Sequence, residues 1–192
     1  MKKQDFLKGK LLIAMPSIQG DDFSHSVVFL CEHSREGAMG IVLNKPAPRM
    51  IFADIVEKLD LPQNSGAADE EIMNMPVMLG GPVQQFQGFV LHSTDYKGEG
   101  TLKVSRDYSL TATIDVLQAI ASGRGPARKL LALGYAGWSP GQLESEILRN
   151  GWLTSDADVD LVFSPEAGTK HQSALKKLGV DPAMLSGDAG HA

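Results

Sequence analysis

The sequence predicts a mixed α+β fold in a single domain that spans residues 1–192. Three observations lead to this prediction. The 192 residues match one domain of ordinary size, and no internal repeat or linker divides them. Segments with strand-like patterns outnumber segments with helical periodicity, and several neighbouring strands are joined by short turns. A doubly wound parallel sheet, which needs a crossover helix between successive strands, is therefore disfavoured.

The predicted strands are short apolar or β-branched runs that end at proline, glycine or clusters of polar residues. Residues 34–37 have the composition of a tight turn, so the strands on either side of it are expected to form a hairpin. The predicted strands are 10–15, 27–33, 39–43, 76–79, 88–92, 101–104, 108–110, 129–135 and 159–163.

Helices are predicted where apolar residues recur at a spacing of three or four. Residues 51–59 have this spacing, and so do residues 114–121, which follow Thr113 as a cap. Residues 169–178 form a third amphipathic segment, which ends at a glycine. Residues 61–74 are predicted to be a long, mobile loop, and the last dozen residues a tail on the surface.

A further helix is predicted within residues 131–153, L-A-L-G-Y-A-G-W-S-P-G-Q-L-E-S-E-I-L-R-N-G-W-L. Ser139 is a good N-cap, and Gln142 completes a Ser-x-x-Gln capping box. An Asn-Gly pair ends the helix, and Trp138 and Trp152, the two tryptophans of the chain, flank it. The stretch is interpreted either as a ligand cradle or as a stable strand-to-helix junction.

Composition limits the classes of partner and the compartment. The net charge of −5 disfavours a dedicated nucleic-acid binder, because phosphate contacts need a basic surface. No helix-turn-helix is predicted, because the helices at 114–121 and 140–149 each lead into a strand. The single cysteine, Cys31, cannot form an internal disulfide, and the apolar run 11–15 is too short for a signal core or a membrane span. We therefore expect a cytoplasmic protein with no membrane or direct nucleic-acid partner.

Six motifs, found in order along almost the whole chain, resemble the bacterial AlgH/YqgE family. They are L-I-A-M-P-S at 12–17, V-V-F-L-C-E-H at 27–33, G-A-M-G-I-V-L-N-K-P at 37–46, P-V-M-L-G-G-P at 76–82, L-G-Y-A-G-W-S-P-G-Q-L-E-S-E-I at 133–147 and G-D-A-G-H-A at 187–192. The resemblance implies one domain with a branched, barrel-like sheet flanked by helices. The family is sometimes labelled a transcriptional regulator because of a genetic link to alginate control. The resemblance brings no established reaction, cofactor or catalytic residue, so no cofactor is predicted.

Two positions depart from the family pattern. His25 stands where the family usually has arginine, and His171 stands where its last helix usually carries tryptophan. A role that rests on that arginine or that tryptophan is therefore not carried over to this chain.

Cys31 and His33 are the candidate catalytic residues. Positions i and i+2 of a strand face the same side, so the thiol and the imidazole are expected to be neighbours, and a histidine beside a cysteine stabilises the thiolate. Alternatively, Cys31 is a small apolar group of the core and His33 a polar end of the strand. The pair supplies only two ligands where a structural zinc site needs four, so no metal site is predicted.

The candidate ligand-binding residues lie at strand ends and turns. The Gly80–Gly81 pair follows a strand, where backbone amides often face a ligand, although a tight turn explains the glycines equally well. Together with Asn44, Tyr135 and Trp138 they outline the expected contact surface.

The first hypothesis is a non-enzymatic binding or regulatory module for a small molecule or a protein, monomeric or weakly homo-oligomeric. The alternatives are a thiol-based enzyme or redox sensor that uses Cys31 with His33, and a direct DNA-binding regulator. The acidic charge weighs against the last.

Overall fold

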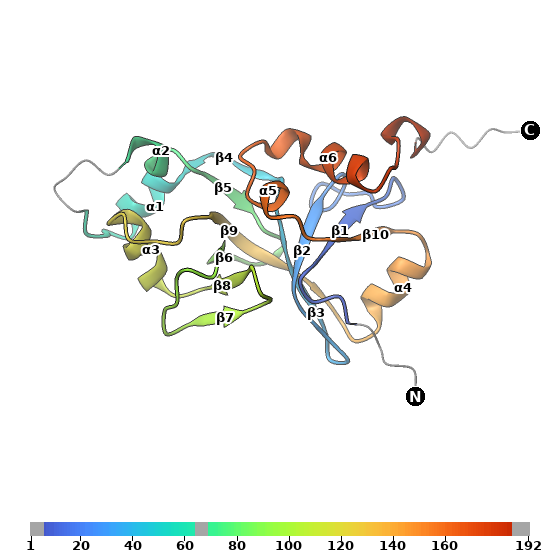
Figure 1. The fold of residues 1–192 in the computed structure, drawn as a ribbon, viewed down its shortest axis with the longest axis horizontal. Coiled ribbons are helices and arrows are strands. Elements are labelled where there is room, and N and C mark those ends of the chain that lie inside the picture. Colours follow the sequence, from blue (N-terminus) through green and yellow to red (C-terminus); the bar gives the residue numbers. More distant parts are fainter. Residues whose placement is uncertain (1–5, 64–68, 186–192) are drawn as a thin grey trace, which may run out of the picture.

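The computed structural model describes residues 6–63 and 69–185, which form one curled, branched sheet flanked by helices (Figure 1). The strands of its main path follow the order β10-β1-β2-β3-β9-β6-β8-β7. Their bounds are β10 Trp152–Asp156, β1 Lys10–Ala14, β2 Val27–Ser34, β3 Gly37–Val42, β9 Lys129–Trp138, β6 Val83–His92, β8 Ser109–Thr111 and β7 Thr101–Lys103. The predicted α+β class and branched sheet are confirmed.

Strand β9 is the branch point of the sheet. Along one edge it pairs with β6, and along the other it pairs first with β5 (Pro76–Leu79) and then with β3. The pairing with β5 is parallel, and β4 (Pro46–Ile51) lies antiparallel to β5 on its far side. The ten-residue strand therefore belongs both to the part of the sheet formed by β5, β9 and β6, called here the β5–β9–β6 arm, and to the part that contains β3.

The helices cover three separate parts of the sheet (Figure 1). Helices α1 (Phe52–Lys58) and α3 (Ile114–Ala121) pack over the β5–β9–β6 arm. Helix α4 (Gln142–Leu148) packs beside β3 and β10. Helices α5 (Val159–Val162) and α6 (Lys170–Lys177) pack against β1 and β2, on the face opposite to α4. The short helix α2 (Glu70–Met73) contacts α1 and α3, and 3-10 turns occupy Ala167–Thr169 and Pro182–Leu185.

Residues 11–14 of β1 and 27–31 of β2 are all apolar, because both faces of the sheet are buried there. In β1, Leu11 and Ile13 join the cluster under α5 and α6, whereas Leu12 and Ala14 join the cluster under α4. The period of two along the strand divides its side chains between two cores. This explains why these segments lack the apolar–polar alternation of a half-exposed strand.

The segment 159–163, predicted as a strand, contains the helix α5 (Val159–Val162), and Phe163 is the C-cap of that helix. Asp158 caps α5, because its Oδ1 accepts the backbone N–H of Leu161 at 2.9 Å. A short apolar run fits a strand or a buried helix equally well by pattern alone, and the capping aspartate decides in favour of the helix.

Three smaller predictions also need correction. The predicted loop 61–74 contains α2, and its residues 64–68 lie outside the described residues. Two strands were not predicted: β4 lies between the predicted strand 39–43 and the predicted helix 51–59 and takes Ile51 from that helix, and β10 precedes the segment predicted as a strand at 159–163. The N-cap of α4 is Gly141 rather than Ser139; the Ser139 backbone N–H still donates to Gln142 Oε1 at 2.9 Å, so half of the predicted capping box forms.

Candidate functional site

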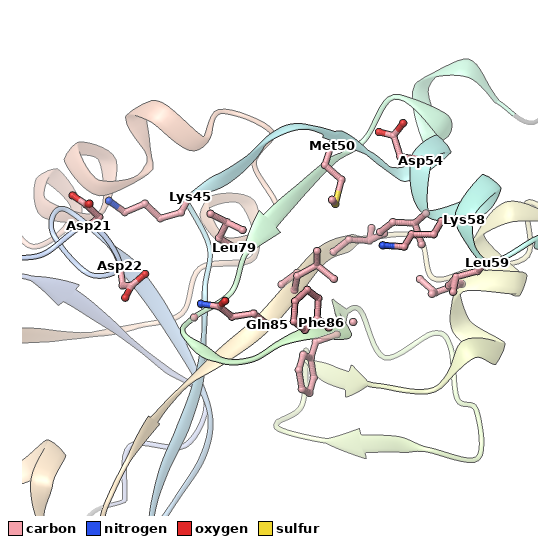
Figure 2. A pocket seen from close by; sticks show the side chains of 18 residues that line it. Asp21, Asp22, Lys45, Met50, Asp54, Lys58, Leu59, Leu79, Gln85 and Phe86 are labelled. Carbon is pink, nitrogen blue, oxygen red and sulfur yellow. The ribbon is translucent and has the colours of Figure 1, made fainter.

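A groove of about 710 Å³ lies between α1 and the β5–β9–β6 arm of the sheet (Figure 2). Its lining is mainly apolar and comes from segments far apart in the sequence. The apolar lining residues are Met50, Ile55, Leu59, Leu79, Phe86, Phe89, Leu117, Leu131, Ala132 and Leu133. A groove of this size and composition has the dimensions of a binding site for a small molecule or for a side chain of another protein.

The floor of the groove is the first half of β9, whose residues Leu131–Leu133 pair with β5 on one side. Gly88 of β6 borders this floor, and a Cβ built on it meets nothing within 4 Å. The missing side chain at Gly88 therefore helps to leave the groove open.

One wall of the groove is a large bulge in β6. Val83 pairs with Tyr135 and Gly88 pairs with Leu133, so the four residues 84–87 stand opposite the single Gly134. Gln84 adopts a left-handed conformation, φ +48°, that turns the chain out of the sheet. The bulge presents Phe86 to solvent with 98% of its surface exposed, an unusual position for a large aromatic side chain.

Charged side chains form the rim at both ends of the groove (Figure 2). Asp21 and Asp22, from the loop after β1, lie at one end with Lys45, and Lys58 of α1 lies at the other end. Lys45 Nζ donates to the carbonyl of Ser24 at 2.6 Å. Asp54 of α1 accepts the backbone N–H of Ile51 at 2.8 Å and so caps its own helix.

Gly80 and Gly81 serve close packing of the backbone. A Cβ on Gly80 would lie 2.3 Å from the carbonyl oxygen of Gly134, and one on Gly81 would lie 2.1 Å from the carbonyl carbon of Tyr135. Gly81 also has φ +151°, a conformation that side chains disfavour. Gly81 lines the groove, so of the expected ligand-binding residues it is the one that the structure places there.

The other expected ligand-binding residues lie elsewhere, so the predicted set does not form one site. Asn44 fixes the start of β2, because its Oδ1 accepts the backbone N–H of Val27 and its Nδ2 donates to the carbonyl of His25, both at 2.9 Å. Tyr135 is half-buried edge-on against Phe89. Trp138 is buried under α4, in a core cluster that shares no residue with the lining of the groove.

The expectation that Cys31 and His33 face the same side is wrong. The pairing of β2 with β3 shifts by one residue between Leu30 and Glu32, so Cys31 is the extra residue of a bulge. Cys31 joins the cluster under α5 and α6, whereas His33 points to the opposite face. There its Nδ1 accepts the backbone N–H of Leu7 at 2.9 Å and its Nε2 donates to Glu144 at 3.0 Å. Both ring nitrogens of His33 are therefore engaged away from the thiol.

Cys31 is completely buried, and burial raises the pKa of its thiol, with a smaller contribution from the charge of Glu32. A raised pKa keeps the thiol protonated at neutral pH, the opposite of what a nucleophilic or redox-active cysteine requires. Within residues 6–63 and 69–185, no group of three or more His, Cys, Asp or Glu side chains is placed to hold a metal ion.

The two departures from the family pattern meet in space. The rings of His25 and His171 stand edge to face with centroids 5.6 Å apart. His171 Nε2 donates to the carbonyl of Ala14 at 2.9 Å, and burial lowers the pKa of its imidazole, with the charges of His25 and Lys45 acting in the same direction. The pair therefore attaches the loop before β2 to α6.

Sequence reasoning missed the groove because its lining comes from seven separate segments. One local signal was available in the sequence. Phe86 is a lone aromatic residue among three glutamines, in a segment with neither strand alternation nor turn composition. In the described part of the chain, no helix has the length and apolar character needed to cross a membrane.

Comparison with known proteins identifies the family. The model of the AlgH-like family matches residues 11–183. A "UPF0301 protein" of Rhodopseudomonas palustris is 50% identical over 196 residues, which cover 100% of this chain and 89% of the relative. A second one, from Ruegeria pomeroyi, is 52% identical over 187 residues, which cover 97% of this chain and 99% of that relative.

Solved structures agree with this assignment. The solution structure of the AlgH protein from Pseudomonas aeruginosa superposes with a TM-score of 0.74 at 38% identity and covers 100% of this chain and 99% of its own. A crystal structure from Corynebacterium diphtheriae, 20% identical with a TM-score of 0.70, covers 96% of this chain and 92% of its own and shares the fold. The sequence, the family motifs and the branched sheet of the present protein together show that this chain belongs to the AlgH-like family.

Proposed function

We propose that the protein is a non-catalytic binding module of the cytoplasm, and that the groove beside β9 receives an apolar group of its ligand. The observation that carries the proposal is the apolar groove of about 710 Å³, which lies next to the fully exposed Phe86. Soluble proteins seldom leave such a surface uncovered unless it binds something.

The apolar lining of the groove supplies affinity for the ligand, and the charged residues of the rim determine the orientation in which the ligand binds. Burial of an apolar group against residues such as Leu79 and Leu133 contributes about 25 cal/mol for each Å² removed from water. Lys58 and the pair Asp21 and Asp22 at opposite ends then favour one direction of binding. A ligand with an apolar centre and charged ends fits this pattern.

The same residues weigh against catalysis in the groove. The described residues that line it include aspartate, lysine and glutamine but neither histidine, cysteine nor serine, so no nucleophile with an adjacent base is assembled. Cys31 and His33 lie on opposite faces of β2 with their polar groups engaged elsewhere. The burial of Cys31 also weighs against a thiol-based sensor.

Any effect on transcription is then indirect. The net charge is −5, and α3 and α4 lead into β9 and β10 instead of forming a helix-turn-helix. A regulatory role of the kind that the family label implies would act through the ligand or partner of the groove.

A dye titration tests the proposal. Anilinonaphthalene sulfonate, an apolar dye with a charged end, is expected to bind saturably and to shift the backbone amide NMR signals of residues 79–89 and 131–133. Leu79→Ser, at a half-exposed position of the lining, is expected to weaken dye binding by about tenfold.

Leu148→Ser provides the matched control, because Leu148 is 83% exposed on α4, outside the groove. This variant is expected to bind the dye as the unchanged protein does. Equal binding by both variants, or shifts centred on another surface, would contradict the groove as the binding site.

A further inference from the structure

Phe86 stands between two hollows on one face of the molecule. On one side lies the groove, and on the other lies a more open hollow of about 570 Å³, whose lining includes Leu59, Ile114 and Leu117. Phe86 contributes to the lining of both. Phe86 therefore projects next to two cavities that could each accept an aromatic side chain.

Large exposed apolar residues gather around this point. Leu59, Leu79 and Ile114 each have nearly half of their surface exposed and border one of the two hollows. Together with Phe86 they form a contiguous apolar surface of the kind that marks an interface.

We propose that the groove binds Phe86 of a second copy of this chain, in a two-fold symmetric pair. The inference rests on the proposed function, because it uses the same groove as the binding site. In a two-fold pair the same surface is used by both copies, so this surface must be complementary to itself. A projecting side chain next to a groove meets this condition, because each copy inserts its Phe86 into the groove of the other copy.

The charges on the rim complement themselves in the same way. Asp21 and Asp22 lie at one end of the groove and Lys58 at the other (Figure 2). A two-fold axis across the middle of the groove brings the acidic end of each copy to the Lys58 end of the other. Lys45 and Asp54 keep their charges, but a hydrogen bond to the backbone of their own copy fixes the position of each, which leaves Asp21, Asp22 and Lys58 as the rim charges without such a bond among those described. The opposite charges thus pair twice, whereas a parallel arrangement would place like charges together.

The pair is expected to be weak. The contact consists of one aromatic anchor in each direction within a small surface, and small interfaces belong to transient complexes. Association should therefore depend on protein concentration, and the monomer with its open groove should predominate when the protein is dilute.

Sedimentation velocity over a concentration series from about 1 to about 500 μM tests the pairing. The unchanged protein is expected to move from monomer toward dimer as its concentration rises. Phe86→Ser is expected to remain monomeric throughout, and Leu148→Ser, which removes an equally accessible apolar side chain from α4, to associate as the unchanged protein does. A monomer at every concentration, or association unaffected by Phe86→Ser, would overturn the inference.

A charge exchange tests the two-fold geometry. Lys58→Glu alone, and Asp21→Lys with Asp22→Lys alone, each create two repulsive contacts in a pair of identical copies, so both variants are expected to be monomeric. A mixture of the two variants makes both contacts attractive and is expected to restore association. If the mixture stays monomeric while the unchanged protein pairs, the two-fold arrangement is wrong.

The dye titration separates failure of this inference from failure of the proposed function. If the unchanged protein stays monomeric but binds the dye in the groove, only the pairing is refuted. If the groove also fails to bind the dye, the groove itself is refuted as the binding site.

Discussion

Trp138 and Trp152 direct their indole N–H groups at the same carboxylate oxygen, Glu146 Oε2, at 3.0 and 2.8 Å. The two rings meet edge to face with centroids 6.0 Å apart, and Phe23 packs against both. The other oxygen of Glu146 accepts from Gln142 at 2.9 Å. The carboxylate therefore fastens α4 to the ends of β9 and β10.

Glu146→Ala is expected to lower the free energy of unfolding by about 2–4 kcal/mol, because two hydrogen bonds to a charged group are lost and two indole N–H groups of buried rings lose their partner. Urea denaturation followed by tryptophan fluorescence measures this change. The chain has only two tryptophans, so the signal reports on this cluster alone. Leu148→Ser on the same helix should change stability by less than about 0.5 kcal/mol. A similar loss in both variants would show that the carboxylate has no special role.

Gly81→Ala is expected to destabilise the protein by at least about 3 kcal/mol, because the added Cβ would lie 2.1 Å from the carbonyl carbon of Tyr135 in a disfavoured backbone conformation. Thermal unfolding followed by circular dichroism measures the effect. Gly168→Ala is the matched control, since its Cβ meets nothing within 4 Å. A Gly81→Ala protein with unchanged stability would show that the glycine is not needed for packing.

Cys31 is expected to be inert to iodoacetamide in the folded protein, because the thiol is buried and burial raises its pKa. Alkylation, followed by mass spectrometry, should be slower than in the urea-unfolded chain by at least about a thousandfold, the ratio set by the free energy of unfolding. Leu148→Cys supplies an exposed thiol that should react at an ordinary rate in the same folded protein. Rapid modification of Cys31 itself would revive the thiol hypothesis.

Because Lys170 is buried, we expect the free energy of unfolding to rise at alkaline pH. Its side chain is 1% exposed, its Nζ donates to the carbonyls of Val162 at 2.9 Å and Leu43 at 3.4 Å, and burial lowers its pKa from 10.5 to about 8. Between pH 8 and 10.5 the unfolded chain holds a proton that the folded protein has released, so the free energy of unfolding increases with pH across this window, by about 3 kcal/mol in total.

Lys170→Met removes this titration while keeping most of the side-chain volume. The difference in unfolding free energy between the unchanged protein and the variant, measured by urea denaturation at several pH values, isolates Lys170 from other groups that titrate there. That difference is expected to shift in favour of the unchanged protein from pH 8 to 10.5. A difference that does not change with pH would contradict a lowered pKa.

Most strands and the longer helices could be predicted from the sequence because their signals are local. The apolar runs of β1, β2 and β9 and the helical spacing of α1, α3 and α6 are properties of neighbouring residues. The helix α5 could not be separated from a strand by periodicity, since four residues are too few to distinguish the two patterns. Strand β4 was missed for a different reason, because its two prolines are typical of a loop or of an edge strand.

The candidate site was harder to predict because two bulges determine it. The extra residue Cys31 in β2 places the side chain of His33 on the other face of the sheet. The bulge of residues 84–87 in β6 exposes the side chain of Phe86 to solvent. A bulge depends on the register of the partner strand, which the sequence of one strand does not contain. Asn44 and Trp138 were singled out as polar or aromatic residues at strand ends, but their partners, Val27 and Glu146, reveal structural roles.

The position of β1 has a consequence for synthesis on the ribosome. β1 lies between β2 and β10, so one edge of β1 stays without a partner strand until Trp152–Asp156 has been synthesised. β9 likewise joins strands that were made some 40 to 100 residues earlier. Such distant pairings fold slowly and late. We expect the nascent chain to remain incomplete, with apolar edges open to chaperones, until about four-fifths of it has left the exit tunnel.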